Sequence, residues 1–266
     1  DVWHSEAAAL ATPWVSRVAL GDPLLAGGPS DVASLSARRV AGVDRRAGVG
    51  RALMRYLVAQ LRERTGGSQW RIAAHWHDAS DTEQSPCLDL SRYQRLDTPT
   101  SQFWADPFVA FDQGRYWIFY EQMPRWSGKG VIEVLEYGPT GVIGAPRVVL
   151  DRPYHLSYPF VFRDEGTWYM MPETSEARCV ELYRATSFPG GWERVGTLIE
   201  NVNAVDATLH RDGNRWWMFV TLANPGAPAW DELHLYSADR LAGPWQPHAL
   251  NPVSRSAVGS RPAGPL

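Results

Sequence analysis

Three short stretches of the sequence place a reactive side chain just before an apolar run. They are FWADPF, HLSYPF and AVDATL, and the first and third contain Asp106 and Asp206. Cleavage of a glycosidic bond needs two neighbouring carboxyl groups, because one protonates the leaving oxygen while the other activates water or attacks the sugar. Mutual repulsion and partial burial would raise the pKa of one of them and supply the acid. We therefore predict that both residues are catalytic; the structural alternative for Asp106 is a cap in an Asp-Pro turn.

The three stretches open successive copies of an internal repeat. The copies begin at residues 105, 157 and 205 and read ADPFVAFDQGRYWIFYEQ, SYPFVFRDEGTWYMMPET and VDATLHRDGNRWWMFVTL. Each copy has a short apolar strand, an Asp in its eighth position, a turn at Gly and a second strand rich in aromatic residues. The segments VELYRATSFPGGWERV and LHLYSADRLAGPWQPH match in the same way. A four-stranded unit of about 50 residues has the size of a propeller blade, and the agreement of both halves argues against unrelated hairpins that share an Asp-Gly turn.

These units predict an all-β protein, a five-bladed β-propeller of four-stranded antiparallel blades with a short helical N-terminal segment. The N-terminal segment is residues 1–68, where GVGRALMRYLVAQLRERTG has the periodicity of an amphipathic helix. The propeller is residues 69–266, with blades at about 103–155, 156–203 and 204–252 and the start of a further blade at 253–266. Three complete units do not close a ring from their own strands unless the N-terminal segment contributes, so we expect this sequence to be a truncated version of a longer protein.

Equivalent positions of successive blades converge in a propeller, because the innermost strand of each blade lines the central channel. The repeat alignment places four residues in this ring: Asp106, Tyr158, Asp206 and, from SRPAG, Arg261. The next layer, at the end of each second strand, holds Glu121, Glu173 and Thr221. We predict Glu173 as a third catalytic residue and Glu121 as a substrate-binding residue. The alternative for both is a hydrogen-bond acceptor between blades.

Other side chains are of the kinds that hold a sugar. The chain has 13 Trp, 10 Tyr and 8 Phe, and large amphipathic rings are suited to sugar faces. Trp104, beside Asp106, and Trp126, in a predicted loop, are predicted stacking platforms, with core packing as the alternative. The residues predicted to contact sugar hydroxyls are His155, Ser157, Tyr158 and Arg261; for the first three the alternative is packing at a blade edge.

Composition excludes several other functions. The net charge is −3, from 26 basic and 29 acidic residues, so there is no electrostatic surplus for nucleic acid or anionic lipid. We predict no metal and no cofactor, because the seven His are scattered and the two Cys have no CxxC spacing. The sequence contains no run of about 18 apolar residues, so we predict no membrane insertion. The first residues lack the pattern of a signal peptide, which favours a cytoplasmic location.

At FWADPF, HLSYPFVF, YMMPE and VDATLHRDGNRWWMF the sequence resembles the N-terminal propeller domain of glucosamine inositolphosphorylceramide transferases and its bacterial relatives. More distantly it is similar to the five-bladed propeller glycosidases of the arabinanase, xylosidase and invertase types. The wider resemblance implies that Asp106 is the general base or nucleophile and that Asp206 tunes the acid and orients the substrate. The general-acid Glu of those glycosidases lies in a later blade, whose equivalent here is absent or begins with Arg261, so Glu173 is the nearby substitute.

Residues and resemblance together predict a carbohydrate-active protein that acts on a glycosidic bond by hydrolysis or glycosyl transfer. Its partner would be a carbohydrate or a glycoconjugate. Two alternatives stay open at this point. One is a non-catalytic glycan-binding module that keeps the aromatic cleft without a complete acid and base, and the other is a propeller that binds proteins. Fold analogy does not choose among them.

Overall fold

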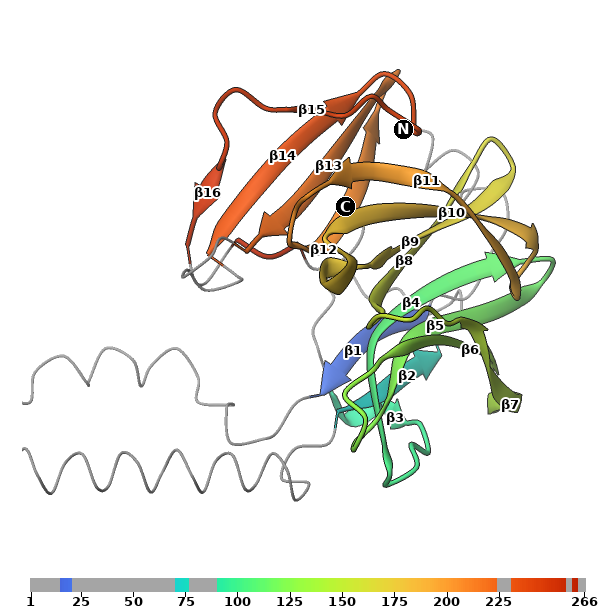
Figure 1. Ribbon diagram of the computed structural model, residues 1–266. Coiled ribbons are helices and arrows are strands. Elements are labelled where there is room, and N and C mark those ends of the chain that lie inside the picture. Colours follow the sequence, from blue (N-terminus) through green and yellow to red (C-terminus); the bar gives the residue numbers. More distant parts are fainter. Residues whose placement is uncertain (1–14, 21–69, 77–89, 224–230, 257–259, 263–266) are drawn as a thin grey trace, which may run out of the picture.

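The computed structural model describes residues 15–20, 70–76, 90–223, 231–256 and 260–262 (Figure 1). Within these ranges the chain is built from β-strands, and its helices are two single 3₁₀ turns, η3 (Leu90–Arg92) and η4 (Ser175–Ala177). The all-β class predicted from the sequence is confirmed. No helix in this part of the chain has the length and apolar character needed to cross a membrane.

Each copy of the repeat forms one antiparallel sheet whose first four strands follow chain order; the first two sheets have four strands and the third has five. The first sheet contains β4 (Gln102–Asp112), β5 (Arg115–Pro124), β6 (Val131–Gly138) and β7 (Gly141–Leu150). The second contains β8 (Ser157–Asp164), β9 (Thr167–Glu173), β10 (Cys179–Ser187) and β11 (Gly191–Glu200). The third contains β12 (Ala204–Asp212), β13 (Arg215–Leu222), β14 (Glu232–Ala238) and β15 (Gln246–Pro247). The predicted four-stranded antiparallel units are thus confirmed, and the total of five blades stays a prediction.

A further short strand, β16 (Ser254–Arg255), pairs with β14 at the edge of the third sheet. Residues 254–255 therefore extend the third sheet. The start of a further blade at residues 253–266 stays a prediction.

The turns explain why the repeat carries Asp and Gly at fixed places. Two-residue loops join β4 to β5 and β8 to β9, and in each loop both residues have positive φ: 49° and 79° at Gln113 and Gly114, and 46° and 80° at Glu165 and Gly166. This is the conformation of a type I′ hairpin, which matches the twist of the strands and favours Gly at its second position. The local sequence therefore sets the register of the first two strands in both sheets.

A small sheet precedes the three repeats. In it β2 (Arg71–Trp76) lies between β1 (Val15–Leu20) and β3 (Gln94–Arg95), antiparallel to both. The strand β1 falls inside the segment predicted as helical or irregular, so that prediction is wrong for residues 15–20. Its partner lies more than 50 residues away, and local periodicity carries no signal for such a pairing. The predicted helix at residues 48–66 lies outside the described residues.

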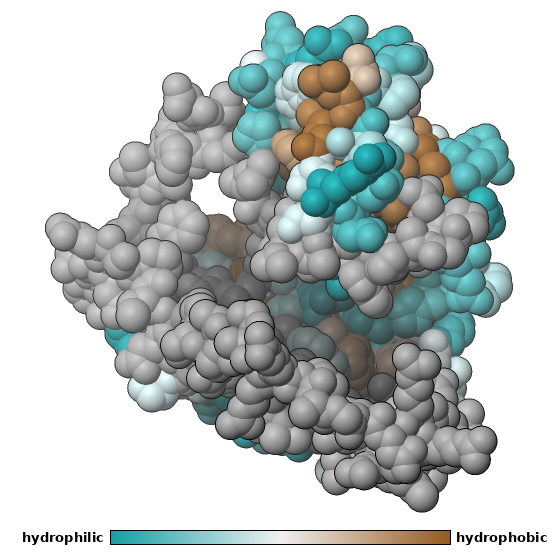
Figure 2. All heavy atoms as spheres, turned by 90° about the vertical axis from the view of Figure 1, so that its left-hand side faces the viewer, coloured by the Kyte–Doolittle hydropathy of each residue, from teal (hydrophilic) through white to brown (hydrophobic). Residues whose placement is uncertain are grey.

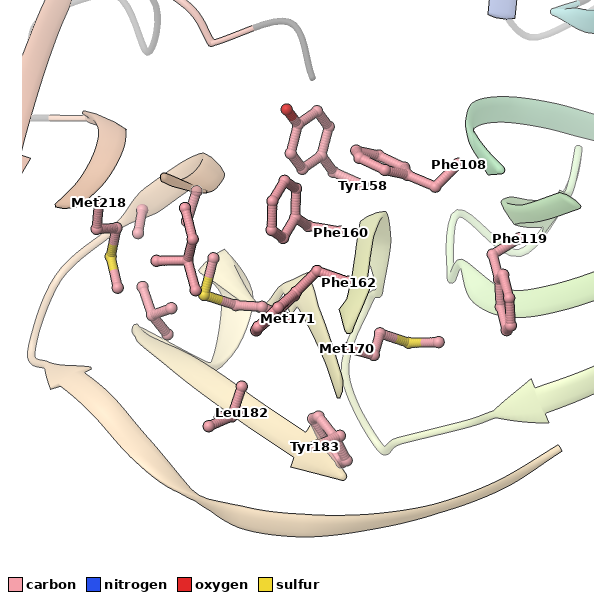
Figure 3. Close-up of a cluster of buried hydrophobic side chains, with 14 of the residues drawn as sticks. Phe108, Phe119, Tyr158, Phe160, Phe162, Met170, Met171, Leu182, Tyr183 and Met218 are labelled. Atoms are coloured by element: carbon pink, nitrogen blue, oxygen red, sulfur yellow. The ribbon is translucent and has the colours of Figure 1, made fainter. Parts of the chain in front are cut away.

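The sheets pack face to face around apolar side chains. A large cluster joins the three repeat sheets, with Phe108, Phe160, Met171 and Met218 among its members (Figure 3). A second cluster lies between the small N-terminal sheet and the first repeat sheet. Polar contacts link successive sheets as well, because the eighth-position Asp112 accepts a hydrogen bond from Trp168 Nε1 at 3.1 Å. Asp164, its equivalent in the second sheet, pairs with Arg211 in the third.

The two faces of the third sheet differ in burial. On β13, Met218 and Val220 are fully buried in the large cluster, whereas Trp217 and Phe219, which alternate with them, are half-buried. Figure 2 looks at the molecule from the side on which this sheet lies and shows apolar side chains at the surface among polar ones. One face of the sheet therefore belongs to the core, and the other keeps part of its apolar area in contact with water.

Candidate functional site

The first strand of each sheet is interrupted at the same place by a β-bulge. The register shifts lie between Ala105 and Phe108 in β4, between Ser157 and Phe160 in β8, and between Val205 and Thr208 in β12. Within each bulge one residue adopts a left-handed backbone conformation: Asp106 with φ of 48°, Tyr158 with 42° and Asp206 with 54°. Residues other than Gly rarely do so, and the conformation costs about 1–2 kcal/mol. These are the three positions that the repeat alignment superimposes.

The end of each second strand lies beside the bulge of its own sheet. Ala105 pairs with Glu121, Ser157 with Glu173, and Val205 with Thr221. Glu121 is buried, and so is Thr221, whose hydroxyl donates to the Ser260 carbonyl at 2.8 Å. The register therefore brings Glu121 next to Asp106 within one sheet, in the same way as it brings Glu173 next to Tyr158.

Glu173 also crosses from the second sheet to the third. Its Oε2 accepts the backbone N–H of Asp206 at 3.1 Å, and its Oε1 accepts the hydroxyl of Ser175 at 3.0 Å. Burial raises the pKa of Glu173, and these two hydrogen bonds oppose the rise only in part. The carboxyl group is thus held rigidly beside the bulge of the neighbouring sheet and keeps an increased affinity for a proton.

Asp206 forms an ion pair with Arg261. The guanidinium Nε donates to Asp206 Oδ2 at 2.6 Å, and Nη2 contacts the same oxygen. The Asp206 side chain is 6% exposed and that of Arg261 is 47% exposed. Burial raises the pKa of Asp206 to about 7; Arg261 lowers it, and the negative charges of Glu173 and Asp106 add to the rise. Desolvation outweighs the ion pair, so this carboxyl group exchanges a proton near neutral pH.

Asp106 and Glu121 complete the group. Burial and then the charge of Glu173 raise the pKa of Asp106, against a backbone hydrogen bond from Tyr158 and the charge of Arg261. Burial also raises the pKa of Glu121, whose Oε1 lies 3.3 Å from His155 Nε2. The four carboxyl groups are therefore close enough to change one another's protonation. We call this set the carboxylate cluster: Asp106, Glu121, Glu173 and Asp206, flanked by His155 and Arg261.

Two predicted sugar contacts lie in the protein interior instead. Trp104 is 4% exposed, its ring centroid lies 4.7 Å from that of Tyr120, and its Nε1 donates to Gln102 Oε1. It is a core residue, which corrects its prediction as a stacking platform. Tyr158 is 6% exposed and packs edge-on against Phe108 (Figure 3), while its hydroxyl shares a hydrogen bond of 2.7 Å with Thr208. Its phenol is therefore packed in the core beside the bulges.

The remaining predicted contacts differ in exposure. Trp126 is 76% exposed and lies in the turn after β5. Ser157 is buried at the start of β8, and His155 is half-buried just before it. The sequence did not point to Ser175 or Gly130, which contact Glu173 and His155 respectively. Ser175 follows Glu173 by two residues in MPETSE. This short separation was the feature of the sequence that could have predicted their hydrogen bond.

The carboxyl groups do not form a metal site by their arrangement. Among the described residues, no group of three or more His, Cys, Asp or Glu side chains has the geometry to hold a metal ion. What the arrangement offers is acid and base chemistry, because neighbouring buried carboxyl groups raise one another's pKa and titrate as a coupled set.

Comparison with known proteins matches this part of the chain to a family. The model of the family described as "Glucosamine inositolphosphorylceramide transferase 1, N-terminal" matches residues 78–265. The rice protein (Oryza sativa subsp. japonica) named glucosamine inositolphosphorylceramide transferase 1 is 35% identical over 180 residues, which are 64% of this chain and 24% of that protein. The Arabidopsis thaliana protein of the same name is 30% identical over 183 residues, 68% of this chain and 24% of its own length. The chain thus spans about a quarter of these relatives.

Solved structures resemble the fold. The exo-β-1,3-galactanase of Clostridium thermocellum aligns with a TM-score of 0.51 and 13% identity, over 68% of this chain and 45% of the galactanase. At this identity the likeness concerns the fold alone, and it supports the predicted β-propeller architecture.

Proposed function

Because the chain belongs to the family of the N-terminal region of glucosamine inositolphosphorylceramide transferase 1, we propose that its carboxylate cluster acts on a glycosidic bond of a carbohydrate or glycoconjugate. The observation that carries the proposal is the convergence of carboxyl groups from three sheets, each with a raised pKa. Glycosidic bond cleavage requires one carboxyl that keeps its proton near neutral pH and one that does not. In a double-displacement mechanism, hydrolysis and transfer to another sugar use the same two groups, because they differ only in the acceptor of the second step.

The surroundings of each carboxyl group suggest its role. Arg261 pairs with Asp206, and Asp106 is our candidate to attack the sugar or to activate water. Glu173 is our candidate acid, because burial raises its pKa. Asp206, whose N–H binds Glu173, would hold and tune that acid. Glu121, His155, Ser157, Trp126 and Arg261 are the candidate substrate contacts, and Arg261 would act mainly through Asp206.

The test compares turnover and binding in matched Asp→Asn variants. Asp106→Asn should lower turnover at least about 100-fold while it leaves glycan binding within a few-fold, because it removes the base and keeps the shape. Asp239→Asn is the control, since Asp239 is exposed at a turn of the third sheet. Turnover would be measured on aryl glycosides and glycoconjugates of varied sugar and linkage, and binding on a glycan array. Equal turnover in the two variants would contradict the role of Asp106.

The ion pair between Asp206 and Arg261 favours a second candidate, a glycan-binding module without turnover. The guanidinium of Arg261 holds Asp206 in place. Arg261 also stands where the wider resemblance predicts the blade that carries the general-acid Glu. This candidate predicts that the wild-type protein binds glycans, that it turns over none of them, and that Asp106→Asn weakens binding. A protein that neither binds nor cleaves any glycan would exclude both candidates.

A further inference from the structure

His155 connects the carboxylate cluster to a neighbouring loop. It lies in the connection from β7 to β8, and its Nε2 is 3.3 Å from Glu121 Oε1 in β5. On the other side of the ring, Nδ1 is 3.0 Å from the backbone nitrogen of Gly130. Gly130 ends the segment of residues 125–130 that joins β5 to β6, which we call the β5–β6 loop. One imidazole therefore contacts both a buried carboxyl group and the backbone of this loop.

The β5–β6 loop is anchored at both of its ends. At its start, the Arg125 N–H donates to the Ser101 carbonyl at 3.0 Å, and at its end, the Leu156 N–H donates to the Gly130 carbonyl at 3.1 Å. Gly130 packs so closely that a Cβ on it would overlap the Leu156 carbonyl oxygen and lie 2.9 Å from His155 Cε1. Only glycine fits this contact, so the loop is seated directly on the residues that follow β7.

This anchored loop presents an exposed aromatic ring. Trp126 is 76% exposed, although the backbone on either side of it is held by hydrogen bonds. A large ring that is left in water on a fixed support suits stacking against a sugar, because little conformational entropy is lost when the ligand binds. Trp126 and Gly130 belong to the same six-residue loop, so a change in the docking of Gly130 can reach the ring through the loop backbone.

The docking contact depends on the proton of His155. Nδ1 has two backbone neighbours with opposite needs: the Gly130 N–H at 3.0 Å needs an acceptor, and the Gly128 carbonyl at 3.2 Å needs a donor. A neutral ring with its proton on Nε2 accepts from Gly130 and donates to Glu121. An imidazolium has only donors, so it binds the Gly128 carbonyl and loses the Gly130 contact. Protonation thus exchanges one backbone partner for another within the same loop.

Several charged groups set this equilibrium. The hydrogen bond to Glu121 raises the pKa of His155, burial opposes the rise, and the charge of Glu173 adds to it. Glu176 in η4 accepts the backbone N–H of His155 at 2.6 Å. The other charged groups around it are Asp106, in the cluster, and the surface pair of Lys129 and Asp151, at the loop.

We propose that His155 is a positioning residue whose neutral form holds the Gly130 end of the β5–β6 loop, the loop that carries Trp126, and whose protonation releases the Gly130 contact. The use of Trp126 for a sugar rests on the proposed function. The exchange of hydrogen-bond partners does not, because it follows from the geometry of His155, Gly128 and Gly130 alone.

The exchange is tested by NMR on the whole chain without a ligand. Hydrogen exchange at the Gly130 amide, corrected for its intrinsic pH dependence, should become about tenfold faster as the pH falls through the titration of the His155 ring. The titration is followed on the imidazole nitrogens, whose shifts also report the tautomer. Lys129→Ala is the control in the same loop, because it removes only an exposed ion pair. Protection of Gly130 that does not follow the His155 titration would overturn the proposal.

Two substitutions separate the two sides of the ring. The amide oxygen of Asn can take the place of Nδ1, so His155→Asn should keep Gly130 protected and remove its dependence on pH. The amide of Gln reaches the place of Nε2, so His155→Gln should keep the contact with Glu121 and lose the protection of Gly130. Equal protection in the two variants would contradict the assignment. If either variant unfolds, Gly130→Ala displaces the loop with His155 intact and should expose the same amides.

Measurements of glycan binding link the loop to the proposed function. On any glycan that the array identifies, Trp126→Ala and His155→Gln should both weaken binding about tenfold or more. Affinity that is unchanged in Trp126→Ala would refute the platform while the exchange data stand. Absence of any glycan ligand would count against the proposed function and would leave the proton-dependent docking of Gly130 to be judged on the NMR result.

Discussion

The bulges of the first, second and third sheets have the same backbone conformation but carry different side chains. Asp106, Tyr158 and Asp206 all adopt the same left-handed conformation. Two of them are carboxyl groups with raised pKa values, whereas Tyr158 is a core residue bonded to Thr208. Backbone strain often marks functional sites, but here it recurs at Tyr158, a buried residue of the core. The strain therefore belongs to the architecture of the repeat, and the side chain decides whether a bulge can do chemistry.

The largest expected difference between these positions is in the pH dependence of stability. Because the pKa of Asp206 rises to about 7 on folding, the folded chain binds more protons than the unfolded chain between about pH 4 and pH 7. The free energy of unfolding must then fall as the pH rises through this window, by up to about 1.4 kcal/mol for each unit of pKa shift. The raised pKa values of Asp106, Glu173 and His155 act in the same sense.

Urea denaturation at pH 5, 6, 7 and 8 measures this slope. Asp206→Asn should flatten it, because the variant has lost the ionisable group, while Tyr158→Phe should keep the wild-type slope. An Asp206→Asn profile as steep as that of the wild type would mean that the carboxyl at this bulge does not carry the raised pKa.

A smaller effect is expected when the phenol of the second sheet is shortened. Tyr158→Phe removes the hydrogen bond to Thr208 and should lower the free energy of unfolding by about 0.5–1.5 kcal/mol. Glycan binding should be unchanged, because the hydroxyl is buried. Thermal or urea unfolding checks the first part and the glycan array checks the second. Loss of binding with unchanged stability would place Tyr158 among the ligand contacts and reverse its assignment to the core.

The smallest expected effect is the difference in stability between Gly and Ala at a bulge position with the left-handed backbone conformation. Asp106→Gly should be more stable than Asp106→Ala by about 0.5–1 kcal/mol, because glycine adopts the left-handed conformation without steric cost, and this gain outweighs its larger loss of entropy on folding. At Asp239, which is not among the residues with positive φ, the order should reverse and Ala should be the more stable. Urea midpoints of the four variants decide the matter. The same order at both positions would show that the bulge is not strained.

Local patterns predicted much of the sheet structure. The Asp-x-Gly turns and alternating aromatic strands mark hairpins whose register follows from two-residue loops, so Glu121 and Glu173 could be placed beside the bulge positions. Pairings between distant segments were missed. The strand β1 binds β2 across more than 50 residues, and Trp104 is covered by the small N-terminal sheet, which nothing in its own neighbourhood indicates.

By itself the sequence determined the all-β class, the four-stranded units and the equivalence of Asp106, Tyr158 and Asp206, because all three follow from a repeat whose period and turns are local. Only the tertiary structure decided which of these side chains are buried together. Three features arise where separate sheets and connections meet. They are the raised pKa of Asp206, its ion pair with Arg261, and the hydrogen bond from the Gly130 N–H to His155. Desolvation and contact between distant segments are properties of the packed chain, and no short stretch of sequence encodes them.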